Sequence, residues 1–246
     1  MTTDASDFSA LDFSDLAASR RSVRAYTDQQ VPRDVLDAIL KDATTAPSWS
    51  NTRAFRVALA TGERADRLRE EYVRRFNQTL DIQHHKRFAT IKTALKRELP
   101  DGDFPVWKPY PKELRAPQVE VAKLVYGAYG VERRDYEGRD NANRRNVSAF
   151  NAPVMGFVFV HEKMLPWSAM DAGLMLQTLF LSAKARGVDS CAIGVLSAWR
   201  GPVEQEFEIP QHYKLITGFC LGYADTEAPI NQVSAPRPPI QLLEGK

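Results

Sequence analysis

Residues 168–187, SAMDAGLMLQTLFLSAKARG, are the part of the chain that most constrains its fold. They predict a helix that ends at Gly187 and carries apolar residues on nearly every face. Residues 153–161, PVMGFVFVH, form a continuous apolar run of strand length. Because both segments need cover on more than one side, we expect a buried helix and a buried strand at the centre of one core.

The rest of the chain alternates between strand and helix patterns. Further strands are predicted at 55–61, 189–195 and 213–225, and helices at 8–19, 31–46, 63–98, 118–129, 132–148 and 199–207. Residues 99–117 contain five prolines and are predicted to form an irregular loop. Together these elements predict an α+β fold around one mixed, mostly antiparallel sheet.

The size and charge of the chain exclude several classes of protein. Its 246 residues, 43% of them hydrophobic, suffice for one large domain or for one domain with an insertion. A net charge of +2 gives no reason to expect a nucleic acid partner. Neither a membrane span nor a signal peptide is expected, because the apolar stretches are short and the first residues are acidic. Cys191 and Cys220 suggest neither a disulfide framework nor a metal site, so we expect a cytoplasmic protein.

Three arginines lie close together in the segment ASRRSVRAYTD. If this segment is extended, Arg20, Ser22 and Arg24 share one face. Arg21 and Val23 then point the other way. Two guanidinium groups and a hydroxyl on one face make a receptor for an anion such as phosphate. The alternative, from the residues alone, is a charged turn exposed to solvent.

No catalytic side chain or metal ligand stands out in the sequence. The chain lacks the dinucleotide motif G-x-G-x-x-G, the P-loop, the nucleophile elbow G-x-S-x-G and the metal motif H-E-x-x-H. Cys191 has no neighbouring histidine to activate it, and we interpret it as a small buried hydrophobic residue. If the protein is an enzyme, a bound cofactor is therefore expected to carry the chemistry.

The order of several segments resembles the FMN-dependent nitroreductase family, and most closely its nitrobenzoate-reductase-like branch. SRRSVR is followed by a helix and APSWSN, and later by NAPVMGFVFV, SCAIGV, GFCLGYAD and APRPPI. The resemblance covers residues 16–61 and 146–240 and implies the nitroreductase-like fold, a central sheet flanked by helices. It implies one domain over residues 1–246, with a helical and loop insertion at 63–148 and a tail at 226–246 that wraps over a partner subunit.

The resemblance also implies a homodimer with two FMN sites between the subunits. Arg20 and Ser22 are then expected to face the phosphate and ribityl chain of FMN, with Arg21 beside them and Arg24 near the pyrimidine side of the ring. Arg237 in APRPPI matches the arginine in the family's tail that helps to bind the phosphate. An exposed tail charge is the alternative for this arginine.

APSWSN matches the family segment that lies over the flavin ring from the other subunit. The match assigns Pro47, Ser48 and Asn51 to the cofactor site. Trp49 stands where the family often has a small residue. It is predicted either to narrow the pocket beside cofactor and substrate or to lie in the core of the dimer interface.

Two further matches concern the flavin ring. SCAIGV resembles the segment whose backbone amide binds the flavin N5, so Ile193, Gly194 and Val195 are predicted to contact the cofactor. Gly194 would allow the backbone to approach closely. Asn146 matches an asparagine that precedes the apolar strand, and it is predicted to contact the edge of the ring.

The activity that the resemblance implies is reduction of nitroaromatic compounds to hydroxylamines or amines, by ping-pong hydride transfer from NAD(P)H. Water can supply the protons, so no dedicated acid is required. Trp107 and Tyr110, in the proline-rich loop, are predicted to cover the substrate pocket. Two alternatives stay open. One is the same flavin fold acting on quinones, enones or halogenated aromatics, and the other is a protein without enzymatic activity that binds a phosphorylated ligand or a nucleic acid.

Overall fold

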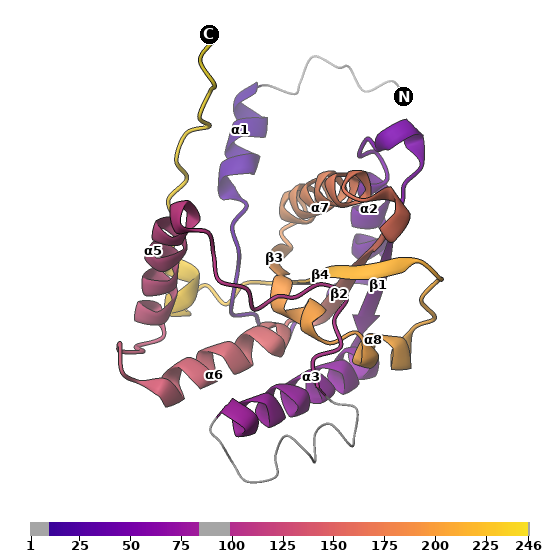
Figure 1. Ribbon diagram of the computed structural model, residues 1–246. Coiled ribbons are helices and arrows are strands. Elements are labelled where there is room, and N and C mark those ends of the chain that lie inside the picture. Colours follow the sequence, from indigo (N-terminus) through magenta and orange to yellow (C-terminus); the bar gives the residue numbers. More distant parts are fainter. Residues whose placement is uncertain (1–9, 84–98, 246) are drawn as a thin grey trace.

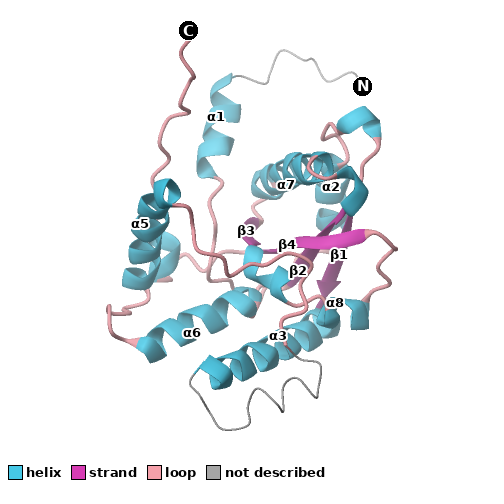
Figure 2. Cartoon of the chain, viewed as in Figure 1, coloured by secondary structure: helices cyan, strands magenta, loops and turns pink. Residues whose placement is uncertain are grey.

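The protein folds around one four-stranded sheet (Figures 1 and 2). The computed structural model describes residues 10–83 and 99–245. The strands are β1 (Phe55–Thr61), β2 (Val154–His161), β3 (Asp189–Ile193) and β4 (Tyr213–Gly222). Their order is β1-β2-β4-β3, and all neighbouring strands are antiparallel. The predicted α+β class is confirmed, and the parallel part of the expected mixed sheet is an isolated bridge between Ser22 and Ser190.

Helices cover both faces of the sheet. The α-helices are α1 (Ala10–Ser19), α2 (Arg33–Ala43), α3 (Gly62–Gln83), α5 (Lys112–Ala128), α6 (Tyr136–Val147), α7 (Trp167–Ala185) and α8 (Gly201–Glu206). Helices α2 and α7 lie together on one side of the sheet, and α3 and α6 lie on the other (Figure 1). Helix α5 stands at the edge, beside the C-terminal segment.

Strand β2 is buried on both faces. Phe157 and Phe159 point into the core cluster beneath α3, whereas Val158 and Val160 point into the cluster beneath α2 and α7. All four side chains are at most 1% exposed. The apolar run at 153–161 thus correctly predicts a strand that is covered on both sides, because alternate residues of a strand face opposite ways.

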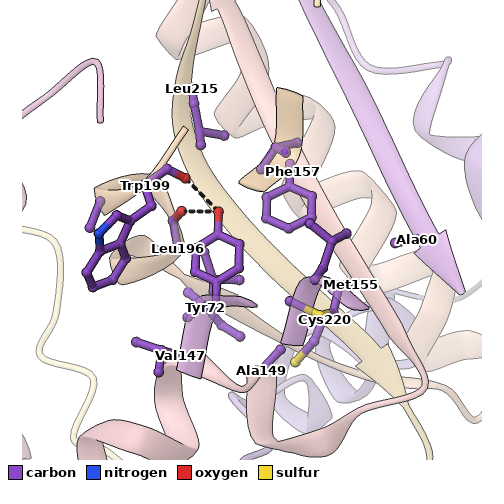
Figure 3. Close-up of a cluster of buried hydrophobic side chains, with 14 of the residues drawn as sticks. Ala60, Tyr72, Val147, Ala149, Met155, Phe157, Leu196, Trp199, Leu215 and Cys220 are labelled. Carbon is purple, nitrogen blue, oxygen red and sulfur yellow. Dashed lines mark hydrogen bonds between the residues drawn. The ribbon is translucent and has the colours of Figure 1, made fainter. Parts of the chain in front are cut away.

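The cluster beneath α3 is centred on aromatic side chains (Figure 3). Tyr72 and Trp199 are both fully buried, and their rings meet edge to face with centroids 6.2 Å apart. The Tyr72 hydroxyl lies 2.7 Å from the carbonyl oxygen of Leu196 and 2.8 Å from that of Trp199. Tyr72 therefore ties α3 to the turn that follows β3, which belongs to the candidate site.

Helix α7 matches the predicted helix at 168–187, and Gly187 follows it with a φ of 73°. The expectation that this helix is buried on every side is wrong. Trp167, Met170 and Leu174 are 42%, 48% and 41% exposed, and their spacing places them on one face. The sheet and α2 cover only the opposite face, so the single chain leaves an apolar stripe uncovered. The composition of a segment shows that its helix is apolar. How many faces of that helix are covered depends on which elements pack against it in the folded chain.

The proline-rich segment contains more regular structure than predicted. Helix α5 begins at Lys112, directly after Pro111, and includes Pro117 in its interior. Pro117 removes one backbone hydrogen bond, to the carbonyl of residue 113, which the helix tolerates near its start.

Two other predicted elements differ in length from the observed ones. Strand β3 is shorter than predicted, because Gly194–Ala198 forms a 3₁₀ turn. The predicted helix at 63–98 is α3 as far as Gln83, and its remainder lies outside the described residues.

Candidate functional site

Residues 20–26 run as an extended segment along the edge of β3. The Val23 N–H donates to the carbonyl oxygen of Ser190 at 3.1 Å, and Ser22 forms the parallel bridge with Ser190. Val23 is 1% exposed, so Ser22 and Arg24 point away from the core on the other face of the segment. This alternation was predicted.

The polar face of this segment borders a cavity of about 340 Å³. We call it the arginine cavity, because its polar lining consists mainly of cations. These side chains, which come from the N-terminal segment, the end of α7 and the tail, are Arg20, Arg21, Arg24, Lys184 and Arg237. Among the lining residues that the structure describes there is no carboxylate. Arg21, expected on the opposite face, also borders the cavity, so the alternation predicted from Arg20 onward does not keep it away.

The cations of this cavity lie close enough to repel one another. Burial and the positive charge of Arg237 together lower the pKa of Arg20. Lys184 is paired with Asp189 at 2.8 Å, so its charge is partly neutralised. The charges of the four arginines face one cavity, and two of these arginines, Arg20 and Arg237, come from positions 217 residues apart in the chain. Such a pair is stabilised by an anion with several acceptor oxygens.

A buried asparagine joins the tail to the arginine segment. Asn231 is 2% exposed, and its Oδ1 accepts from the backbone N–H of Arg24 at 2.8 Å. Its Nδ2 donates to the carbonyl oxygens of Ala25 and Asp225, both at 2.8 Å. These bonds hold the chain just ahead of Arg237 against the segment that carries Arg20.

Arg24 also borders a second cavity, of about 230 Å³, which we call the tyrosine cavity. It lies between α5 and α6, and its lining includes Tyr126, Tyr129, Asn146 and Phe150. Burial raises the pKa of the Tyr129 hydroxyl, which keeps it neutral. The structure thus brings Asn146 and Arg24, both predicted site residues, to one cavity.

The third predicted segment begins where β3 ends. Ile193 is buried, whereas Gly194 is exposed and no atom lies within 4 Å of the position that a Cβ would take. Along β3, Gly194 lies four residues beyond Ser190, about 13 Å from the bridge to Ser22. Cys191, on the same strand, is buried, and burial raises the pKa of its thiol. This agrees with its interpretation as a buried hydrophobic residue.

The APSWSN segment lies far from the arginine cavity in the same chain. Trp49 stacks on Trp167 at the start of α7, with ring centroids 4.5 Å apart, and its backbone N–H donates to the buried Asp171 at 3.0 Å. Lys184, near the other end of α7, borders the arginine cavity. Seventeen helical residues separate Trp167 from Lys184, a distance of about 25 Å. Trp49 therefore lies at the end of α7 away from the arginine cavity, and residues 47–51 are not among those that line it.

Metal-binding side chains and membrane-spanning helices are two further features that bear on the kind of site. No group of three or more metal-binding side chains is found in the part of the chain that the structure describes. None of the described helices is long and apolar enough to cross a membrane.

The family model for nitroreductases matches residues 17–223. The chain belongs to the nitroreductase family. It is 32% identical over 229 residues to 4-nitrobenzoate reductase of Nocardioides sp. (strain LMS-CY), which covers 93% of this chain and 87% of the relative. It is 30% identical over 228 residues to chloronitrobenzene nitroreductase of Comamonas testosteroni, which covers 91% of each chain. The family predicted from the sequence is confirmed.

Solved structures of nitroreductases have the same fold. The FMN-dependent nitroreductase NfnB from Mycobacterium smegmatis, in complex with NADPH, is 27% identical with a TM-score of 0.80, and the match covers 94% of this chain and 95% of that one. The FMN- and NADPH-dependent nitroreductase NfnB from sphigopyxis sp. strain HMH is 26% identical with a TM-score of 0.80, covering 95% and 99%. These matches confirm the nitroreductase-like fold.

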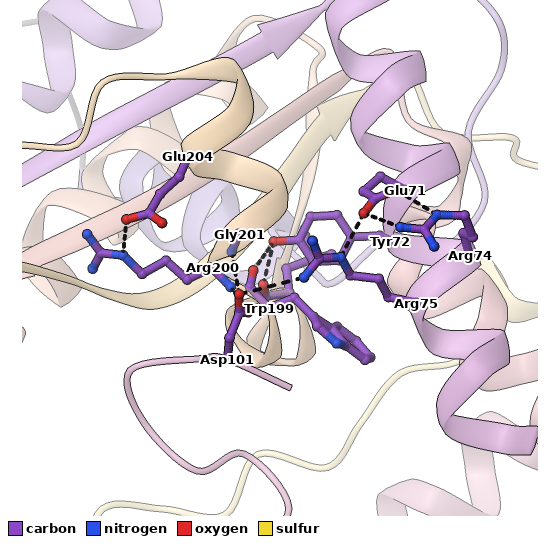
Figure 4. A network of polar contacts seen from close by, with 10 residues as sticks. Glu71, Tyr72, Arg74, Arg75, Asp101, Trp199, Arg200, Gly201 and Glu204 are labelled. Atoms are coloured by element: carbon purple, nitrogen blue, oxygen red, sulfur yellow. Dashed lines mark hydrogen bonds and ion pairs between the residues drawn. The ribbon is translucent and has the colours of Figure 1, made fainter. Parts of the chain in front are cut away.

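In this nitroreductase the loop with Trp107 and Tyr110 follows Asp101, which is anchored at Arg75, Arg200 and Gly201 (Figure 4). The Asp101 carboxylate accepts from the backbone N–H groups of Arg200 at 2.7 Å and Gly201 at 3.1 Å, and lies 3.6 Å from the buried Arg75. Trp107 is 54% exposed and meets the Trp199 ring edge to face at 5.6 Å. Neither Trp107 nor Tyr110 lines the arginine or the tyrosine cavity, and their role toward substrate stays a prediction.

Sequence reasoning missed two residues of the site, Lys184 and Asn231. Lys184 lies in the last turn of a helix, where a basic residue is ordinary. Asn231 lies in a polar stretch of the tail, and only its burial distinguishes it. No local pattern could have indicated either of them.

Proposed function

We propose that the protein is an FMN-dependent NAD(P)H oxidoreductase that reduces nitroaromatic compounds. The observation that carries this proposal is the juxtaposition of Arg20 and Arg237 in a cavity without carboxylates. The relatives named for nitrobenzoate and chloronitrobenzene reduction support the substrate class. The solved structures named as FMN- and NADPH-dependent support the cofactor and the electron donor.

The residues of the arginine cavity fit the phosphate of FMN. Arg20 and Arg237 present unpaired guanidinium groups, and Ser22 adds a hydroxyl on the same face. A dianion there would relieve the repulsion that lowers the pKa of Arg20. FMN, when bound, supplies hydride transfer between a nicotinamide and an organic acceptor. The chain's own contribution is to bind the phosphate, orient the ring and place fixed charges around it.

Arg24 is the residue we propose for the pyrimidine side of the ring. It borders both the arginine cavity and the tyrosine cavity, so its charge lies where the two meet. Its guanidinium donates to the carbonyl of Ser22 at 3.2 Å, and Asn231 holds its backbone. A cation held in this way stabilises negative charge without having to reorganise. Ile193, Gly194 and Val195 are proposed to lie along the ring, and Asn146 at its edge.

We propose that the active form is a homodimer. Trp49 lies at the opposite end of α7 from Lys184, and we infer that residues 47–51 contribute to the cofactor site of a second copy. The apolar stripe of Trp167, Met170 and Leu174 offers the surface for that copy. The tail offers a second surface, since Leu242 and Leu243 are 87% and 99% exposed.

The stripe on α7 gives a direct test of the dimer. Leu174→Arg is expected to weaken dimerisation at least about tenfold, because it would bury a charge in an apolar contact. Sedimentation velocity over a range of protein concentrations measures the change. Leu114→Arg is the matched control, since Leu114 on α5 is 54% exposed and lies outside the stripe. Wild-type protein that sediments as a monomer at every concentration would contradict the dimer.

The overall reaction proposed is reduction of a nitro group to nitroso and then to hydroxylamine. Each stage takes one hydride equivalent from NAD(P)H and one proton, and water leaves at the first stage. Among the described residues that line the two cavities there is no carboxylic acid or histidine to supply that proton, so solvent is the expected donor. We place the reaction in the cytoplasm, where the free thiols of Cys191 and Cys220 would stay reduced.

The experiment that tests the proposal is an absorption spectrum of the purified protein. We expect a yellow protein whose flavin absorbance is bleached by NADPH without oxygen and restored by 4-nitrobenzoate. Restoration by a quinone but not by the nitro compound would favour the alternative substrate class. A protein that stays colourless after incubation with FMN would contradict the proposed function.

A further inference from the structure

A third cavity lies between α5, the loop that follows it and the start of α6. It is an open groove of about 1350 Å³. We call it the basic groove, after the cations that line it: Arg115, Lys123, Arg133, Arg134 and Arg139. The acidic residue among its lining is Glu132. Five cations against one carboxylate make a concentrated positive region on a chain whose net charge is only +2.

The described part of the chain does not neutralise the charges of the basic groove. Among the described residues, none of the five cations forms an ion pair with a carboxylate. The Arg139 guanidinium instead lies over the ring of Tyr136, 5.1 Å from its centroid. Tyr136 is 67% exposed, so an aromatic face and a cation are presented together to solvent. Guanidinium groups free of carboxylates are suited to bind phosphate.

The groove adjoins the proposed flavin site. Ala122 and Tyr126 line both the basic groove and the tyrosine cavity, and Arg24 lines both the tyrosine cavity and the arginine cavity. The arginine cavity and the tyrosine cavity lie along one face of α5, and the basic groove lies along the adjacent face. Because a helix is about 10 Å across, a ligand that spans two such faces can have one end beside Arg24 and the other among the arginines.

We propose that the basic groove binds the adenosine end of NADPH through its 2′-phosphate and makes NADPH the preferred electron donor. This inference rests on the proposed function, because it requires the nicotinamide end to lie beside the flavin. Arg133 and Arg134, in the loop between α5 and α6, provide the guanidinium groups for the phosphate. The exposed ring of Tyr136 provides a face for the adenine. NADH lacks the 2′-phosphate and would gain little from these charges.

The test is a comparison of the two nucleotides in the flavin-loaded protein carrying Arg133→Ser together with Arg134→Ser. We expect the KM for NADPH to rise about 10- to 100-fold, because charge-assisted hydrogen bonds to a phosphate are lost. The KM for NADH is expected to rise at most about threefold, since the remaining contacts are shared. The matched control is Arg33→Ser, at an exposed arginine of α2 that lies outside all three cavities.

A binding measurement without turnover gives a second readout. Calorimetry with adenosine 2′,5′-bisphosphate and with AMP compares ligands that differ by the 2′-phosphate. We expect the wild-type protein to prefer the bisphosphate and the double variant to lose that preference. Equal affinity of the wild-type protein for the two ligands would overturn the inference. So would equal changes in the KM for NADPH and NADH.

The outcomes separate this inference from the proposed function. A yellow protein that NADPH bleaches, but whose nucleotide preference is unchanged in the double variant, would overturn the basic groove and leave the flavin function standing. A raised KM for 4-nitrobenzoate, with both nucleotides unaffected, would reassign the groove to an anionic substrate and overturn the inference. A protein that binds no flavin would overturn both.

Discussion

Protein carrying Arg20→Ala is expected to bind FMN about 10- to 100-fold more weakly than the wild type and to lose its yellow colour during purification. Arg20 lines the arginine cavity, and burial together with the charge of Arg237 lowers its pKa. Removing it is expected to delete charge-assisted hydrogen bonds to the phosphate, and Arg237 would have to bind the phosphate without it.

Riboflavin, which lacks the phosphate, makes the test specific. Fluorescence titration of the apoprotein is expected to give a large change in the Kd for FMN on Arg20→Ala and a change of at most about threefold for riboflavin. Arg237→Ala is expected to have an effect of the same kind. Arg33→Ala serves as the control, because Arg33 lies on α2 and pairs with Asp37 at 2.9 Å. Equal losses of affinity for FMN and riboflavin would show that Arg20 stabilises the fold and does not bind the phosphate.

The second large effect is expected in the core. Trp199→Ala should lower the free energy of unfolding by about 3–5 kcal/mol, because it leaves a cavity among fully buried side chains. The Trp199 ring lies against Tyr72, as Figure 3 shows, and Tyr72 in turn stacks on Phe157 of β2 with centroids 5.9 Å apart. Urea unfolding followed by circular dichroism, at one protein concentration, measures the loss.

Trp107→Ala is the matched control for this prediction. Trp107 contacts the same Trp199 ring but is 54% exposed, so its loss is expected to cost about 1 kcal/mol or less. A second variant, in which Tyr110 is replaced by alanine as well, examines the predicted cover over the substrate pocket. An unchanged KM and substrate range in a variant that lacks both Trp107 and Tyr110 would contradict that role. A similar loss of stability at positions 199 and 107 would contradict the packing argument.

Parts of the candidate site could be predicted because their geometry is local. The alternation of Arg20, Ser22 and Arg24 follows from the two-residue period of an extended chain, and the buried Val23 between them confirms it. Arg237 was identified only through the resemblance to the family. Lys184 and Asn231 were missed, since nothing near them in the chain shows that they approach Arg20 and Arg24.

Other expectations were wrong where a local rule was applied to a property that depends on neighbours. Proline-rich sequence was taken to exclude helix up to residue 117, yet α5 begins at Lys112 and accommodates Pro117. The composition of α7 was taken to require burial on every face, yet Met170 and Leu174 are exposed. The prediction for α5 overrated the loss of one backbone hydrogen bond at Pro117. The prediction for α7 failed because composition does not show which surfaces of a helix the single chain covers.

By itself, the sequence determined where the strands and most of the helices lie, that Ser22 and Arg24 share a polar face, and that β2 is covered on both sides. These properties depend on the spacing and the polarity of side chains, which the sequence gives directly. Only the tertiary structure decided that Arg20 and Arg237 share a cavity, that Trp49 lies at the opposite end of α7 from it, and that the basic groove adjoins the tyrosine cavity. Residues far apart in the sequence come close only through the packing of the sheet and helices against one another. The periodicity of side chains along the chain does not determine those distances.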